Sequence, residues 1–298
     1  MALLRASFPA AAVALAAVAL AAITLAAVAP ASAQTRLAAA TFAERSALLH
    51  AAQRCPLLGE AELAALAAGA ALARSALLRS GETPARIDTL DAQAALAAAA
   101  RPCHDPALLR SAERAQAGFS AWSRLSIMLF PGQAATWAAT RRPDPEGWYL
   151  RQEGRYGAIL GVREGDSGPV VALAAPLTAR SPEPAFGLLS FRDAARAPHS
   201  LIAVPARLGQ GLAAVSASPA MARQVWAQDR TVILTADGRR LAILSFPINA
   251  FEGINALDPR EAIEVRLGRA MGDVGARLYF EVGDLAAAQA FLAAQPAG

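Results

Sequence analysis

Between residues 230 and 295, the pattern of apolar and polar positions predicts a repeated order of strands and helices. In the first half, two apolar runs flank Asp237-Gly238, a pair typical of a type I′ hairpin turn, in which both central residues need positive φ. Apolar residues from Ile248 to Leu257 then recur at helical spacing, and Asp258-Pro259 ends this run. The two strands of this unit are expected at Thr231–Ala236 and Arg239–Phe246.

The same order recurs in the second half of this region. When the sequence is aligned with itself so that Ile243 matches Phe280, the first unit matches a second unit with the same pattern. There, Asp284 is expected to cap a helix that runs to about Gln295. We therefore predict two tandem strand–strand–helix units. The strands of the second unit are expected at Ala262–Leu267 and Arg277–Val282.

Upstream of these units, β-branched residues, glycines and turn signals dominate from Pro131 onward. Glu164–Gly168 is rich in turn-forming residues and is expected to join two strands. Leu201–Val204 has the composition of a short strand, and Ser218–Val225 that of a helical turn. Further strands are expected at Trp148–Gln152, Tyr156–Val162, Pro169–Ala175 and Phe186–Phe191.

Residues 34–130 have the signals of four helices. A loose leader is expected up to Ala40, after which Thr41 and Glu44 form a capping box, where each side chain accepts the backbone N–H of the other residue. A glycine follows the second helix, and a proline opens the third and the fourth. Because the connections are short, we expect adjacent helices to be antiparallel. The helices are expected at Thr41–Arg54, Gly59–Leu78, Thr83–Arg101 and Asp105–Met128.

Together these elements predict an α+β fold in two parts. The N-terminal helical unit has about four helices and one disulfide, and the β-rich domain that follows ends in the two strand–strand–helix units. The expected boundaries are 34–130 for the helical region and 131–298 for the β-rich α+β domain. Residues 1–33 are assigned to a signal peptide, for the reasons given next.

The N-terminus has the three parts of a secretory signal. Arg5 is the positive residue, an uncharged and mostly apolar run extends from Ala10 to Ala29, and Ala31-Ser32-Ala33 matches the small-residue cleavage pattern. We expect cleavage before Gln34 and a periplasmic or secreted protein. An uncleaved anchor is the alternative, since this run is long enough to cross a bilayer. No later stretch of similar length lacks charge, so no membrane span is expected after cleavage.

Two cysteines, Cys55 and Cys103, remain in the mature sequence. Because the thiols of an exported protein meet an oxidising compartment, an even count suggests a disulfide between them. A metal site that adds His50 and His104 is the alternative, but the ligand spacing matches no zinc pattern. The c-type haem motif is also incomplete, since its first cysteine is replaced by Ala100. We predict a disulfide, no metal and no other cofactor.

Composition and charge narrow the classes of partner. Hydrophobic residues make up 55% of the chain, but many are alanines, which are weakly hydrophobic. All 28 basic residues are arginines and the net charge is only +4, without a cluster of like charges. Nucleic-acid binding requires positive charge gathered on one face. We therefore expect no nucleic-acid partner, and a protein or envelope component of unknown identity instead.

The segment Gly165-Asp-Ser-Gly-Pro169 resembles the nucleophile motif of trypsin-like serine proteases. That motif has two glycines after the serine, whose backbone helps to form the oxyanion hole, whereas Ser167 is followed by one. The histidines, His50, His104 and His199, do not lie in the matching upstream motif. We interpret the segment as a polar hairpin turn. A secreted hydrolase with Ser167 as its nucleophile remains the alternative.

Two further groups of residues have both a functional and a structural interpretation. Trp122, Trp137 and Trp148 lie between the helices and the first strands, where they would form either a stacking platform for a glycan or peptide or an interdomain core. We favour the core. The acidic residues around the strand at 262–267 alternate with apolar ones, which indicates a solvated face and not a paired-carboxylate site. These acidic residues are Asp258, Glu261 and Glu264.

Within residues 231–257, the run Leu241-Ala-Ile-Leu-Ser-Phe-Pro-Ile-Asn-Ala-Phe-Glu-Gly-Ile-Asn-Ala-Leu257 resembles the closing strand and short helix of invasion-associated locus B type periplasmic proteins. The shared features are a glycine-containing turn, an apolar strand, and Phe and Ala-Leu at helical spacing. The resemblance implies a small exported β-rich protein without known catalytic residues. Because no nucleophile–base, metal or phosphate motif is complete in this sequence, we expect a non-catalytic binding or envelope-interaction protein, with no catalytic residues and one disulfide.

Overall fold

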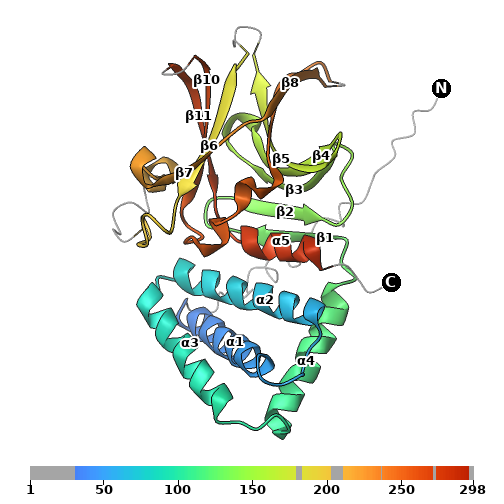
Figure 1. Ribbon diagram of the computed structural model, residues 1–298, viewed down its shortest axis with the longest axis vertical. Coiled ribbons are helices and arrows are strands. Elements are labelled where there is room, and N and C mark those ends of the chain that lie inside the picture. Colours follow the sequence, from blue (N-terminus) through green and yellow to red (C-terminus); the bar gives the residue numbers. More distant parts are fainter. Residues whose placement is uncertain (1–30, 179–182, 203–210, 236, 271–272, 295–298) are drawn as a thin grey trace, which may run out of the picture.

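A computed structural model describes residues 31–178, 183–202, 211–235, 237–270 and 273–294. Four helices lie together at one end of the molecule, and the strands and the last helix form the other end (Figure 1). The α+β class, with about four N-terminal helices ahead of antiparallel sheets, is confirmed. The predicted signal peptide falls largely on residues 1–30, outside the described residues. The helices are α1 Ala31–Ala52, α2 Glu60–Arg79, α3 Pro84–Ala99, α4 Pro106–Trp122 and α5 Leu285–Ala293.

Helix α1 differs from the prediction at its start. Thr41 lies inside the helix and does not cap it, and the expected leader is helical. The reason is packing, because Ala38 and Ala39 contact a buried cluster that includes Phe42 and Ile87. An alanine-rich segment has high helix propensity and becomes helical once one of its faces can be buried.

The end of α2 and the start of α3 follow their capping signals. Glycine ends α2, since Gly81 has φ of 97° and the N–H of Glu82 reaches back to the carbonyl of Leu77 at 3.0 Å. Thr83 accepts the N–H of Arg86 at the start of α3. The expected end of α4 near Met128 is wrong. The helix stops at Trp122, and residues 127–131 alternate between exposed and buried positions as a strand.

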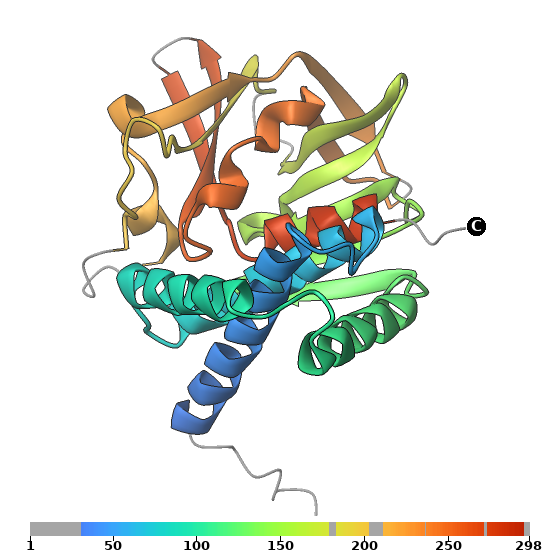
Figure 2. The ribbon, with the colours of Figure 1, turned by 60° about the horizontal axis from the view of Figure 1, so that its bottom comes forward.

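The four helices do not form the expected antiparallel bundle. In Figure 1, α2, α3 and α4 lie along three sides of a triangle, and Figure 2 shows α1 between α3 and α4. α1 packs on both α2 and α3, while α2 also packs on α5 of the β-rich part. By length and composition alone, one helix among the described residues, α2, could cross a membrane. Its Leu77 and Leu78 are fully buried among neighbouring helices, which accounts for part of that apolar composition.

Seven antiparallel strands form the larger sheet, in the order β1-β2-β3-β4-β5-β9-β8. The β1–β2 hairpin, which the sequence analysis did not expect, adds the first two strands at one edge. Its edge strand leaves Ile127 and Leu129 exposed and buries Phe130. The strands are β1 Ile127–Pro131, β2 Thr136–Thr140, β3 Trp148–Glu153, β4 Ile159–Gly165, β5 Gly168–Leu177, β8 Asp229–Leu234 and β9 Arg240–Phe246.

The smaller sheet has four antiparallel strands in the order β11-β10-β6-β7. The two predicted tandem units therefore belong to different sheets, β8 and β9 to the first and β10 and β11 to the second. One continuous core joins both sheets to α2 and α5, with Leu173, Leu244 and Val265 buried between the sheets. The strands are β6 Phe186–Arg192, β7 Ala222–Trp226, β10 Ala262–Ala270 and β11 Asp273–Glu281.

Two local predictions in the first unit are wrong. The β8–β9 hairpin does not have the expected two-residue turn at Asp237-Gly238, because the N–H of Thr235 donates to the carbonyl of Arg239 at 2.8 Å and leaves three residues between them. Gly238 has φ of 80°. The N–H of Gly238 donates to the carbonyl of Thr235 at 2.9 Å, as in a three-residue hairpin loop. The expected helix at 248–257 is replaced by two short 3₁₀ turns, Ile248–Phe251 and Ile254–Ala256, because Gly253 takes a left-handed conformation between them.

Smaller differences affect the remaining elements. Tyr156 precedes β4 in a 3₁₀ turn, with φ of 61°. Residues 219–221 form the expected helical turn, but β7 follows directly at Ala222. Leu201 and Ile202 lie in a turn and not in a strand, and the rest of the segment predicted there lies outside the described residues.

Candidate functional site

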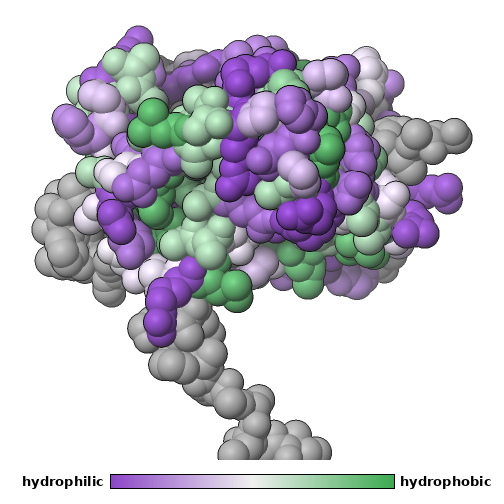
Figure 3. Space-filling model, turned by 90° about the horizontal axis from the view of Figure 1, so that it is seen from below, coloured by the Kyte–Doolittle hydropathy of each residue, from purple (hydrophilic) through white to green (hydrophobic). Residues whose placement is uncertain are grey.

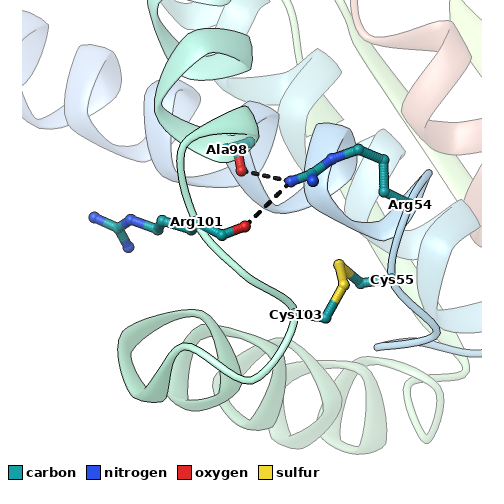
Figure 4. The surroundings of a disulfide bond; sticks show 5 residues. All are labelled: Arg54, Cys55, Ala98, Arg101 and Cys103. Carbon is teal, nitrogen blue, oxygen red and sulfur yellow. Dashed lines mark hydrogen bonds between the residues drawn. A yellow bond between two sulfur atoms is a disulfide. The ribbon is translucent and has the colours of Figure 1, made fainter.

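The predicted disulfide is present in the helical unit. Cys55 and Cys103 are bonded to each other with their Cα atoms 5.5 Å apart, so neither is free to bind a metal (Figure 4). The bond joins the residues after α1 to the connection between α3 and α4. Beside it, Arg54 donates to the carbonyl of Ala98 at 2.6 Å, so two separate contacts fix the end of α1 against α3. A disulfide is typical of proteins in an oxidising, extracytoplasmic compartment.

The histidines do not assemble a site with these cysteines. His50 lies 3.3 Å from Asp91, while His104 and His199 are exposed. In the parts of the chain that the structure describes, no three His, Cys, Asp or Glu side chains come together as metal ligands.

Ser167 lies in the turn that joins β4 to β5. Gly165 pairs with Gly168 across the hairpin, so the polar turn expected at 164–168 is confirmed. The serine is exposed, and its side chain makes no hydrogen bond within the described residues. Among the described residues, no base forms a hydrogen bond with Ser167 that would activate it as a nucleophile.

The aromatic residues separate into two groups. Trp137 and Trp148 are buried, which supports the interpretation of the aromatic region as core for these two. Trp122, on the last turn of α4, is only partly buried. Its ring lies 6.4 Å from that of Phe119 and 5.4 Å from that of Phe291, measured between centroids. Trp122 and Phe119 are therefore available to line a site at the surface.

The prediction of a solvated acidic face is wrong. Asp258, Glu261 and Glu264 are at most 5% exposed. The alternation of acidic and apolar residues was misleading because β10 lies between β6 and β11 and is buried on both faces. Each carboxylate is instead neutralised by an arginine, as buried charges require. The closest pairs are Arg260–Asp258 at 2.9 Å, Arg192–Glu261 at 2.8 Å and Arg266–Glu264 at 2.9 Å.

Glu281, at the end of β11, is a further buried acid that the sequence analysis did not identify. Its carboxylate accepts the backbone N–H groups of Gln133, Ala134 and Ala135 at 2.7, 2.7 and 2.8 Å. Its own N–H donates to Gln152 at 2.7 Å. These contacts attach the β1–β2 turn to the second sheet, so the role of this carboxylate is structural.

A groove of about 370 Å³ lies where the helical unit meets the β-rich part. Residues of α1, α2 and α4 form its walls, with Met128 and Phe130 of β1 and Ala287 of α5. The volume falls within the usual range for small-molecule sites, roughly 300–1,000 Å³. Its apolar wall includes Leu48, Leu66, Leu72, Phe119 and Trp122.

Arg45 of α1 is the charged residue that distinguishes this groove. Its guanidinium is half-buried and donates to the backbone carbonyl of Gly69 on α2. Burial lowers the pKa of Arg45, which the nearby Glu44 opposes. Glu44 itself pairs with Arg114, and Glu62 accepts the N–H of Gly59 at 2.8 Å. Arg45 therefore has no carboxylate partner within the described residues.

Gly69 makes room for this guanidinium in the middle of α2. A Cβ at Gly69 would lie 3.0 Å from Nη1 and 3.2 Å from Cζ of Arg45. A glycine inside a helix costs about 1 kcal/mol relative to alanine, and a partly buried cation without an anion is also unfavourable. Gly69 inside a helix and the partly buried guanidinium of Arg45 are both unfavourable, and they are in contact at the wall of an apolar groove. Such a combination is typical of a binding site.

A second cavity of about 380 Å³ lies on the other side of α1, between α1, α3 and α4. Its lining is mainly alanine and leucine, and none of its described lining residues is aromatic. The helical end of the molecule has hydrophobic and hydrophilic side chains interspersed (Figure 3). We select the first groove because it combines an aromatic wall with a half-buried cation, Arg45, that forms no ion pair among the described residues.

The sequence contains one signal for Arg45 that the analysis above did not use. Phe42 and Leu48 are buried on one face of α1, and Arg45 lies three residues from each. A cation between two buried positions at helical spacing must either pair inside the protein or face a cavity.

No protein-family model, curated protein or solved structure matches this chain. The assignment of function therefore rests on the geometry of the groove.

Proposed function

We propose that this is an exported, non-catalytic binding protein whose ligand occupies the groove around Arg45. The observation that supports this most directly is the combination, in one concave site, of an apolar aromatic wall and a half-buried arginine that forms no ion pair among the described residues. The disulfide between Cys55 and Cys103 supports export, because such bonds persist in oxidising compartments. A periplasmic or secreted location, after signal cleavage, is part of the proposal.

Binding is favoured over catalysis by the chemistry of the groove. Its charged lining residues are Arg45, the Glu44–Arg114 pair, and Glu62 at the N-terminus of α2. Catalysis of acyl or phosphoryl transfer needs a nucleophile beside a base, or a metal. The described lining residues include no histidine or cysteine, and their one hydroxyl, that of Ser111, accepts a hydrogen bond from Arg114 at 2.9 Å. The ligand is proposed to come from the cell envelope or its surroundings.

The test is to isolate the native protein and identify molecules that leave it on denaturation, by mass spectrometry. Gly118→Trp is the blocking variant, because Gly118 lines the groove on α4 and a Cβ there meets no atom within 4 Å. Ala117→Trp is the matched control, on the same exposed helix surface but outside the groove. We expect one molecule to accompany wild type and Ala117→Trp and to be lost in Gly118→Trp. Equal recovery from all three would overturn the proposal.

Fractionation tests the location independently. We expect the protein in the periplasmic or culture fraction, with Gln34 as its first residue. Recovery in the membrane pellet with Met1 retained would instead support an uncleaved anchor.

A further inference from the structure

The groove has a chemical asymmetry that defines a class of ligand. One group on its wall, the Arg45 guanidinium, has N–H donors beyond the one that Gly69 accepts. The other charged lining groups already have partners, since Glu44 pairs with Arg114 and Glu62 accepts the N–H of Gly59. Arg45 is therefore the half-buried cation of this wall that forms no ion pair among the described residues.

The rest of the wall is apolar and favours a hydrocarbon. Leu48, Leu66 and Leu72 line the side formed by α1 and α2, and Phe119 and Trp122 line the side formed by α4. A peptide in this groove would bring backbone N–H and C=O groups that need hydrogen-bond partners when buried. An aliphatic chain has no such groups. Its burial is favourable because it removes apolar surface from water.

Size and charge together point to one kind of ligand. The groove, at about 370 Å³, has space for roughly a dozen waters at about 30 Å³ each, which suits a chain of medium length. A guanidinium binds a carboxylate with two parallel hydrogen bonds, and a partly buried site strengthens them. We propose that the groove binds a medium-chain aliphatic monocarboxylate, with Arg45 receiving the carboxylate. This inference rests on the proposed function.

The decisive measurement compares decanoate with decanol, which has the same chain without the charge. Isothermal titration of the full chain should show decanoate binding on the order of tenfold or more tighter than decanol, as expected for hydrogen bonds to a charged group. In Arg45→Gln this preference should disappear, while decanol affinity changes little. Arg45→Lys should retain part of it, because the charge remains but the two parallel bonds do not. Arg86→Gln, at an exposed position on α3 outside the groove, should leave it unchanged.

A second variant keeps the test valid if Arg45→Gln fails to fold. Gly69→Ala retains the charge but introduces a Cβ 3.0 Å from Nη1, so it should reduce the preference for decanoate by displacing the guanidinium. Gly118→Trp should weaken both probes equally, because it obstructs the groove and leaves Arg45 in place. Each variant is compared with wild type by circular dichroism to confirm its folded state.

Three results would overturn the inference. These are equal affinity of wild type for decanoate and decanol, a preference that persists in Arg45→Gln, or tighter binding of N-acetyl-Leu-Leu than of decanoate, which would indicate a peptide carboxylate. The proposed function has a separate outcome. If a native molecule is lost from Gly118→Trp while decanoate shows no advantage over decanol, the groove remains a binding site and only the carboxylate assignment fails.

Discussion

Arg79, the last residue of α2, forms a bidentate ion pair with Asp284, 205 positions later in the sequence, at 3.0 and 3.1 Å. Asp284 is the N-cap residue of α5, but its side chain accepts no capping hydrogen bond. Its carboxylate instead receives the guanidinium across the boundary between the helical unit and the β-rich part. Because α2 also packs on α5, this pair fixes the helices that form the groove relative to the sheet.

The first prediction concerns this pair. Asp284→Asn should lower the free energy of unfolding by about 2–4 kcal/mol, because the Asp284 side chain is 2% exposed and Arg79 would be left as an uncompensated, mostly buried charge. Chemical denaturation measures the change. Glu252→Gln is the control, since its pair with Arg223 is exposed and should contribute only about 0–1 kcal/mol. Equal effects of the two substitutions would contradict the structural role given to Asp284.

The second prediction concerns the disulfide. Replacing Cys55 and Cys103 together by serine should lower stability by about 2–4 kcal/mol, because the bond closes a long loop in the unfolded chain. Helices α2 and α3, which lie within this loop, are rich in alanine and bury little area per residue. Limited proteolysis should therefore first cut between residues 34 and 110. Thiol labelling of unfolded, unreduced wild type should give no signal, and two labelled thiols would refute the assignment.

The third prediction concerns pH. Backbone hydrogen bonds, from Leu108 first and then Ala107, hold the pKa of the Asp105 carboxyl below its ordinary value. A carboxyl with a lowered folded-state pKa stabilises the protein above its unfolded value of about 3.9, and this contribution is lost as pH falls through the folded value. The melting temperature of wild type should therefore fall progressively below about pH 4.

Asp105→Asn should remove this component of the acid response and leave stability near neutral pH similar, because asparagine is an equally good cap. Asp88→Asn, at an exposed position of α3, should leave the acid response as in wild type. Melting temperatures from pH 7 to pH 2 give the comparison. An acid response that is the same in both variants would show that Asp105 does not contribute to it.

Local signals were sufficient for the starts of α3 and α4 and for the disulfide. The caps of α3 and α4, Thr83 and Asp105, depend on side chains within three residues of the groups that they satisfy. Cys55 and Cys103 could be paired because only two cysteines are present in the chain. Strands β3, β5 and β6 were also recognised, since runs of β-branched and aromatic residues reflect a half-buried pleated surface.

The remaining features depend on contacts between distant residues, which no local pattern encodes. β9 pairs with β5 although β6, β7 and β8 lie between them in the sequence, so the division of the tandem units between two sheets could not be predicted from periodicity. The burial of Glu264 depends on Arg266 and Arg277, which sit on two neighbouring strands. Arg45 and Gly69 meet only because α1 packs on α2, and this is why the groove was not predicted.

The last prediction separates turn geometry from chemistry at the β4–β5 hairpin. Ser167→Ala should leave the free energy of unfolding within about 0.5 kcal/mol of wild type, because the side chain is exposed and makes no hydrogen bond within the described residues. Gly168→Ala should destabilise by about 1–2 kcal/mol, because Gly168 has φ of 115°, a conformation in which a Cβ is strained whatever the surrounding space. Ligand binding in the groove should be the same in both variants. If Ser167→Ala instead abolished a hydrolytic activity of the purified protein at an unchanged melting temperature, the serine would be a nucleophile and the alternative of a secreted hydrolase would replace the binding function.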